Sequence, residues 1–160
     1  MKRILLFWGM AATMCVAAFA IEMKTYENAK FSIGYHADWE ESWSGEEWVN
    51  FENADGDISF NITYNEVGPT KAQLQEAVDN YVYMVKNQGQ KVEQQKVRED
   101  YALVRTIKTD EDDGTQSVET WFLIISKEPE GFSGSVVSPI DKANDALDIM
   151  MEMLGTLSPK

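Results

Sequence analysis

The sequence predicts a single α+β domain, in which a mainly antiparallel sheet of about six strands is flanked by two long helices in an α/β/α sandwich. Segments with alternating apolar residues follow one another through short turns. Two other segments have the three-and-four spacing of an amphipathic helix. Most of the connections are too short for the crossovers that parallel strands need, so we expect antiparallel pairing.

The first twenty residues precede this domain. They read "MKRILLFWGMAATMCVAAFA", with Lys2 and Arg3 before an apolar run that ends in Ala18-Phe19-Ala20. This order predicts a secretory signal peptide cleaved after Ala20 and an exported, periplasmic or extracellular protein. The alternative is a retained membrane anchor, although the apolar run over 4–21 is shorter than the roughly 20 residues of a typical span.

Cleavage after Ala20 would leave 21–160 as one domain, and its composition limits the chemistry. Cys15 is the only cysteine, so the remaining chain could form neither a disulfide nor a thiolate site. The bulky Met14 before Cys15 does not favour lipidation of this cysteine. Loss of Lys2 and Arg3 leaves 12 basic residues against 27 acidic ones, a net charge of −15. Such a chain is repelled by nucleic acid and by anionic lipid, and it suits cationic proteins or divalent cations as partners.

The first half of the domain contains strands and one helix. Residues 30–35, "KFSIGY", place apolar side chains on one face of a strand. Residues 47–65 form a hairpin in which Trp48 and Phe51 lead into the turn at Asp55-Gly56, and the return strand alternates. A capping box at 70–73 begins a helix over 70–88, which Gly89 ends. Its predicted buried face is Leu74, Ala77, Val78, Tyr81, Met84 and Val85.

The second half adds strands and the closing helix. Residues 91–97 indicate a polar edge strand, and 101–108 and 117–126 indicate strong strands joined by "TDEDDGTQ" at 109–116. A short strand over 131–139 precedes a helix over 141–154. Its predicted buried stripe is Ala143, Ala146, Leu147, Met150, Met151 and Leu154.

This order of motifs resembles PsbP-like domains. "YENAKFSIGYHADWE" (26–40) is similar to the opening of that family, although His36 stands where the family has proline. "MLGTLSP" (153–159) resembles the step at which the closing helix of the family ends. The resemblance covers nearly all of 21–160. It implies a helix–sheet–helix sandwich and a role in binding or assembly, without conserved enzyme chemistry or a cofactor.

The most informative stretch for function is "GYHADWEESWSGEEWVNF" (34–51). We expect Trp39 and Trp48 to lie in the core. Trp43 lies in a polar loop and is a candidate for a partner surface, together with Glu46 and Glu47. His36 is the only histidine and has no companion ligand or base, so we interpret it chiefly as a paired structural residue. It is retained as a candidate contact at this surface.

Two other features are weaker candidates. Asp110, Asp112 and Asp113 do not fit the spacing of a calcium loop, which leaves a solvated turn that binds divalent cations weakly at most. In the methionine-rich run over 149–154, we expect Met150 and Leu154 in the core and Met153 exposed as a candidate contact.

No catalytic motif is found, since the sequence lacks a nucleophile elbow, a phosphate loop and a zinc-binding helix motif. The function that the sequence favours is a non-catalytic accessory domain that binds a protein partner. An alternative is a carrier of a small apolar ligand, with a pocket between the sheet and the helices. A weaker alternative is a carbohydrate-active hydrolase that uses the Trp/Glu loop.

Overall fold

The computed structural model describes residues 22–160, so the predicted signal peptide (1–20) and Cys15 lie outside the described part of the chain. Most of its strands form one large sheet with the order β3–β4–β5–β9–β8–β7–β6, in which all neighbouring strands are antiparallel. The bounds are β3 (Glu40–Ser44), β4 (Trp48–Glu52), β5 (Ser59–Asn65), β6 (Lys91–Val97), β7 (Tyr101–Thr109), β8 (Gln116–Lys127) and β9 (Glu130–Pro139).

A second, three-stranded sheet and two helices complete the fold. The small sheet has the order β1–β2–β10, with β1 (Met23–Glu27), β2 (Phe31–His36) and β10 (Ser158–Pro159). The helices are α1 (Leu74–Asn87) and α2 (Ala143–Gly155), and the 3₁₀ turns η1 (Lys71–Gln73) and η2 (Ile140–Lys142) precede them. The α+β class and the antiparallel pairing are therefore confirmed. The expected single sheet of about six strands is wrong, because residues 22–160 form ten strands in two sheets. β1, β3 and β10 are additional to the predicted segments, and β1, β2 and β10 pair separately.

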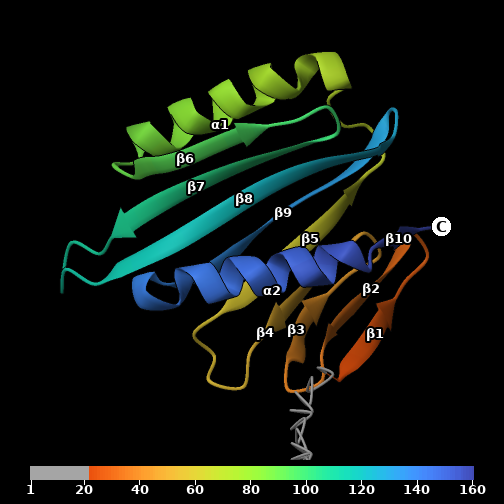
Figure 1. Ribbon diagram of the computed structural model, residues 1–160, viewed down its shortest axis with the longest axis horizontal. Coiled ribbons are helices and arrows are strands. Elements are labelled where there is room, and N and C mark those ends of the chain that lie inside the picture. Colours follow the sequence, from red (N-terminus) through yellow and green to blue (C-terminus); the bar gives the residue numbers. More distant parts are fainter. Residues whose placement is uncertain (1–21) are drawn as a thin grey trace, which may run out of the picture.

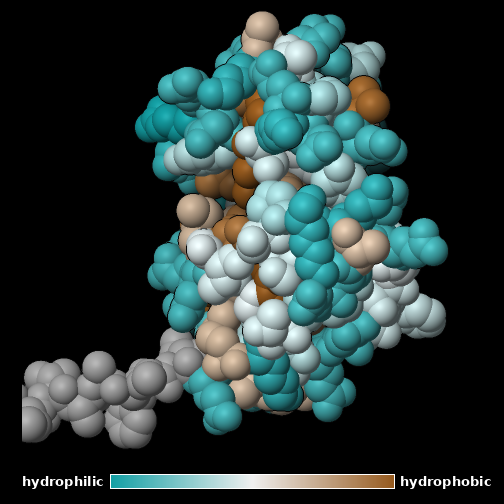
Figure 2. Space-filling model, turned by 90° about the vertical axis from the view of Figure 1, so that its right-hand side faces the viewer, coloured by the Kyte–Doolittle hydropathy of each residue, from teal (hydrophilic) through white to brown (hydrophobic). Residues whose placement is uncertain are grey.

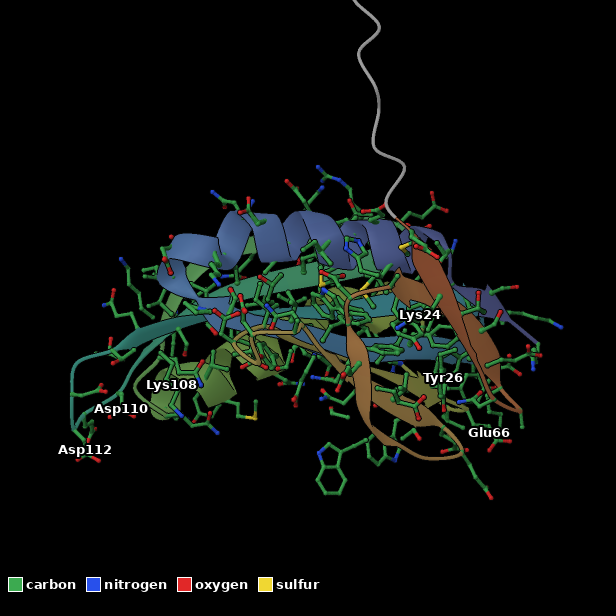
Figure 3. All side chains as sticks on the ribbon, turned by 90° about the horizontal axis from the view of Figure 1, so that it is seen from below. Lys24, Tyr26, Glu66, Lys108, Asp110 and Asp112 are labelled. Carbon is green, nitrogen blue, oxygen red and sulfur yellow. The ribbon has the colours of Figure 1, made fainter. Side chains whose placement is uncertain are left out.

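The two helices lie on opposite faces of the large sheet (Figures 1 and 3). In β7, Ala102 and Val104 point toward α1 and pack against Leu74 and Val78. On the opposite face, Phe122 of β8 packs in the core that α2 and the small sheet cover. Figure 1 shows α1 lying along β6, away from β3 and β4. The sandwich formed by residues 22–160 is therefore incomplete, because neither α1 nor α2 covers the α1-side face of those two strands.

Aromatic side chains fill the core between the large and the small sheets. Phe31 of β2 meets Phe132 of β9 edge-on, with 5.6 Å between ring centroids, and Phe60 stacks on Phe122 at 5.9 Å. Gly134 makes room for this packing, because a Cβ there would lie 2.8 Å from Cζ of Phe122 and 2.0 Å from the carbonyl oxygen of Asn61. The alternating core residues predicted in the return strand are confirmed, and they are Ile58, Phe60, Ile62 and Tyr64.

Local signals in the sequence set the element ends. The backbone N–H of Thr70 donates to the Gln73 side chain at 3.0 Å, which confirms the capping box. Gly89 has a φ of +78°, and Gly56 and Gly114 have φ values of +70° and +74° in their turns. Glycine occupies this left-handed region without the penalty that a side chain imposes, so the three chain reversals occur where the sequence predicts them.

The helix faces differ in detail from the prediction. In α1, Val82 is buried and Met84 is exposed, whereas the sequence placed Met84 on the buried face. In α2, Met153 is fully buried (0% exposed) and Met151 is 46% exposed, so the expected exposure of Met153 is wrong. The buried stripe is Ala143, Ala146, Met150 and Met153, because α2 faces both the large sheet and β2.

Candidate binding surface

Two tryptophans are exposed on the β3–β4 hairpin. Trp43 is 70% exposed and Trp48 is 40% exposed. Trp43 lies opposite Asn50 in the β3–β4 register, and Trp48 is two residues before Asn50, so both side chains belong to the α1-side face of the sheet. The expectation that Trp48 is a core residue is therefore wrong. Val49 and Phe51 point to the opposite face and fill the core.

The turn of this hairpin fixes the position of Trp48. A Cβ at Gly45 would lie 2.5 Å from Nε1 of Trp48, so the indole lies across the turn only because residue 45 is glycine. The backbone N–H of Gly45 donates to the carbonyl of Trp48 at 2.8 Å, and the Tyr26 hydroxyl donates to the carbonyl of Gly45 at 3.4 Å. Trp48 is therefore held at a turn that is closed by a backbone hydrogen bond and is also hydrogen-bonded to Tyr26 of β1.

Carboxylates surround the two tryptophans. Glu40 of β3 lies directly opposite Glu52 of β4, and Glu41 and Glu46 are exposed on the same hairpin. None of these four forms an ion pair with another residue of 22–160, whereas Glu47 lies 3.9 Å from Lys30. The hairpin thus combines aromatic surface with uncompensated negative charge.

A hollow of about 310 Å³ lies beside Glu40 and Glu52, and its lining is Glu40, Ser42, Glu52, Asn53, Ala54, Asp55 and Gly56. Asp55 of this lining lies near Lys142, whose Nζ is 3.7 Å from Asp55 and 2.6 Å from Asp57. The hydrogen bond from Lys142 holds the pKa of Asp57 below its usual range. Within residues 22–160, neither Lys142 nor any other basic side chain forms an ion pair with Glu40 or Glu52.

The structure brings together only some of the candidate residues. Trp43, Glu46 and Glu47 share the β3–β4 hairpin, but His36 is at the end of β2 and is 8% exposed. Nε2 of His36 lies 3.2 Å from Oε2 of Glu152, and its ring lies 6.2 Å from that of Trp39. This is the paired histidine that the sequence favoured. Trp39 is buried as expected, whereas Met153 cannot contact a partner while it is fully buried.

A second candidate surface lies beside α2. None of its residues was predicted from the sequence as a candidate contact. Two adjoining hollows of about 260 Å³ and 180 Å³ share Leu103 of β7 and Met151 of α2 in their lining. The larger one is chiefly apolar, with Tyr101, Phe122, Ile124 and Leu154 in its walls. Figure 2 shows apolar surface within a hollow on the side of the molecule where α2 ends. We call this pair of hollows the α2 groove.

The acidic turn between β7 and β8 lies far from the hairpin tryptophans. Figure 3 shows Asp110 and Asp112 at the opposite end of the molecule from Tyr26, which supports the β3–β4 turn. The carboxylate of Asp110 accepts the backbone N–H of Asp112, and that of Asp113 accepts the N–H of Thr115, both at 2.8 Å. Hydrogen bonds from Thr115 lower the pKa of Asp113. These carboxylates stabilise the turn, and weak cation binding there stays a prediction.

Two general features concern metals and membranes. Within 22–160, no cluster of three or more histidine, cysteine or acidic side chains is arranged to hold a metal ion. None of the helices in that range has the length and apolar character needed to cross a membrane.

Known proteins share this fold at low sequence identity. No family model and no curated protein matches the sequence. The crystal structure of the Ran-binding protein Mog1p from Saccharomyces cerevisiae superposes with a TM-score of 0.63 and 12% identity, covering 87% of this chain and 96% of Mog1p. The solution structure of cyanobacterial PsbP (CyanoP) from Synechocystis sp. PCC 6803 gives a TM-score of 0.60 and 9% identity, covering 91% of this chain and 97% of CyanoP. The resemblance seen in the sequence is thus confirmed at the level of the fold: the chain has the PsbP-like fold.

Proposed function

We propose that this chain is an exported, non-catalytic accessory domain that binds a protein partner through the β3–β4 hairpin. The observation that carries the proposal is the exposure of Trp43 and Trp48 on one face of one hairpin. Exposed tryptophan is costly to keep in water and is enriched among the residues that dominate the energy of protein interfaces. Mog1p, which has the same fold, is a Ran-binding protein, so this fold is compatible with protein binding.

The location belongs to the same proposal. Residues 1–20 have the order of charge, apolar run and small residues typical of a signal peptide. The partner is therefore expected among proteins of the cell envelope or the medium.

Crosslinked affinity capture from the native cell envelope, followed by mass spectrometry, tests the proposal. The bait is the chain from Ile21 to Lys160, with Trp43→Ala as the test variant. Tyr83→Ala is the matched control, because Tyr83 is 71% exposed, close to the 70% of Trp43, but lies on α1. We expect a protein that is captured by the wild type and by Tyr83→Ala but lost with Trp43→Ala. Equal capture by all three baits would rule out the hairpin as the binding surface.

The α2 groove favours a second candidate function, the carriage of a small apolar ligand. Its larger hollow has a volume of about 260 Å³ and apolar walls, which is slightly below the size range of ligand pockets. Native mass spectrometry of protein purified without detergent measures this directly. A retained small-molecule mass that disappears in a Leu103→Glu variant would support a carrier, and an unmodified protein mass would count against it.

A further inference from the structure

We infer, on the basis of the protein-binding role proposed above, that the hairpin binds an extended segment rich in lysine or arginine. This segment adds to the edge of the large sheet next to β3, and one of its basic side chains enters the hollow between Glu40 and Glu52.

The outer side of β3 has backbone groups that a partner strand can reach. This strand is at one edge of the large sheet, so one side of it has no neighbouring strand within the described chain. Paired and unpaired residues alternate along an antiparallel ladder. Counting from the hydrogen-bonded pair Gly45–Trp48, the backbone groups of Ser44 and Glu41 face outward. A partner strand can hydrogen-bond to these groups, which is the way in which extended peptides bind at exposed sheet edges.

Like charges lie next to each other at the start of β3. Glu40 and Glu52 face each other across β3 and β4, and like charges in that position destabilise a sheet. No cation within 22–160 pairs with either of them. A lysine or arginine side chain from a partner would remove this repulsion, so binding and relief of the repulsion are coupled.

The surface beside these carboxylates has room for a side chain. The hollow of about 310 Å³ beside these carboxylates also presents the side chains of Ser42, Asn53 and Asp55. The carboxylate oxygens of Glu40 and Glu52 can accept the hydrogen bonds that an ammonium or guanidinium group donates. The Asn53 amide oxygen already accepts the backbone N–H groups of Asp57 and Ile58, both at 3.0 Å. Within the described residues, no cluster of three or more histidine, cysteine or acidic side chains could hold a metal ion. The ligand that we infer for this hollow is therefore an organic cation, the side chain of lysine or arginine.

The spacing on β3 fixes the pattern of the partner. Glu40 and Trp43 lie opposite Glu52 and Asn50, which are two residues apart in β4. A regular strand added next to β3 therefore places its residues i and i+2 beside Glu40 and Trp43. These residues share one face, about 7 Å apart. The indole of Trp43 attracts a second cation through its face. The pattern that fits is a basic residue at every second position.

The same charges disfavour a second copy of this chain. Another β3 edge would bring Glu40 and Glu41 against their own counterparts, and the whole chain has a net charge of −13. Acidic side chains on an edge strand are a recognised protection against self-association. The edge strand on the other side of the large sheet, β6, has Lys91 and Lys96 as well as Glu93, so it lacks this single sign of charge.

The test uses an eight-residue peptide of alternating lysine and valine with capped ends, and protein purified from cells that produce the full chain. We expect binding by titration calorimetry, an affinity that falls as salt is added, and slower amide exchange at Glu41 and Ser44. The double variant Glu40→Gln/Glu52→Gln should bind about tenfold more weakly, because both carboxylates lie beside the bound cation. The charge-matched control Glu111→Gln/Asp112→Asn, in the β7–β8 turn, should bind like the wild type.

Two altered peptides test strand addition and charge recognition separately. A peptide with N-methylated backbone amides keeps its charge but cannot donate hydrogen bonds to β3, so equal binding by this peptide would overturn strand addition. A peptide with glutamate in place of lysine should not bind, and its binding would overturn the role of charge. Self-association of the free protein that depends on Glu40 would assign the edge to a second copy and would also overturn the inference.

The peptide-binding test and the envelope-capture test can fail independently of each other. If the lysine peptide does not bind but envelope capture still depends on Trp43, the inference fails and the protein-binding role stands. If capture does not depend on Trp43, the proposed function fails, whatever the peptide does.

Discussion

Truncation of Met153 should destabilise the protein far more than truncation of its neighbour Met151. Met153 is fully buried between the large sheet and the small sheet, whereas Met151 is 46% exposed beside the α2 groove. Methionine-to-alanine changes at buried sites cost about 2–5 kcal/mol, because apolar contact is lost and a cavity remains. For Met151→Ala we expect about 1 kcal/mol or less, since a side chain already half in water loses less burial.

Urea denaturation, followed by circular dichroism, measures both changes. With a urea dependence of about 1–3 kcal/mol per molar, a loss of about 3 kcal/mol lowers the midpoint by roughly 1–3 M. Met153→Leu nearly conserves the volume and should cost less than about 1.5 kcal/mol, which separates loss of volume from loss of the sulfur. If Met151→Ala and Met153→Ala lowered the free energy of unfolding equally, the orientation of α2 about its own axis would be refuted. The α2 groove depends on that orientation.

Four further predictions test the packing and the hairpin. Gly134→Ala should cost about 1–3 kcal/mol or more in urea denaturation, because the new methyl group meets Phe122 and the backbone of β5; Gly155→Ala, which adds a methyl group in open space, is the control. Gly45→Ala should displace the Trp48 indole and increase quenching of tryptophan fluorescence by acrylamide with little loss of stability, and unchanged quenching would contradict the packing of Trp48 on Gly45. Because the folded-state pKa of Asp57 is lowered by Lys142, the unfolded chain takes up the proton first as the pH falls; the stabilisation is therefore present above about pH 4 and is lost as the pH falls through the lowered pKa. Asp57→Asn should remove that part of the acid sensitivity in denaturation curves measured from pH 6 to 2, and an unchanged acid profile would contradict it. Glu40→Gln should raise the free energy of unfolding by about 0.2–1 kcal/mol, because it removes a like-charge cross-strand pair; a loss of stability would contradict the repulsion.

The sequence predicts the elements whose formation buries apolar side chains. The core strands β5, β7, β8 and β9 have alternating apolar residues, and each was predicted to within a few residues. β1 and β3 were missed because they are edge strands in which charged and polar residues predominate. Such strands are held chiefly by backbone hydrogen bonds to one neighbour, and these leave no periodic signal in the side chains.

The error at Trp48 has a geometric cause that the sequence contains. Trp48 and Phe51 are three residues apart, so they cannot share a face of a regular strand, whereas Val49 and Phe51 can. A strict count of period two would have placed Val49 inside and Trp48 outside. The exposure of Trp48 was therefore predictable.

The burial of Met153 and the exposure of Met151 were not predictable in the same way. The stripe Ala143, Ala146, Met150 and Met153 and the adjacent stripe Leu147, Met151 and Leu154 both follow helical spacing. Which stripe is buried depends on the position of β2 across the core, and this is a tertiary contact. Helix periodicity alone could not choose between them.

The β3–β4 hairpin concentrates features that oppose folding. An indole exposed at position 43 gains little from burial, and Glu40 opposite Glu52 adds repulsion where a threonine pair would add attraction. Neither helix of residues 22–160 covers the exposed face of this hairpin, although α1 covers the same face over β6 and β7. Local departures from what stability favours are expected at functional sites rather than across a scaffold. The fold is shared with Mog1p and CyanoP at 12% and 9% identity, so a partner cannot be transferred from either protein. The departure of this hairpin from what stability favours is therefore the physical argument behind the proposed binding role of this surface.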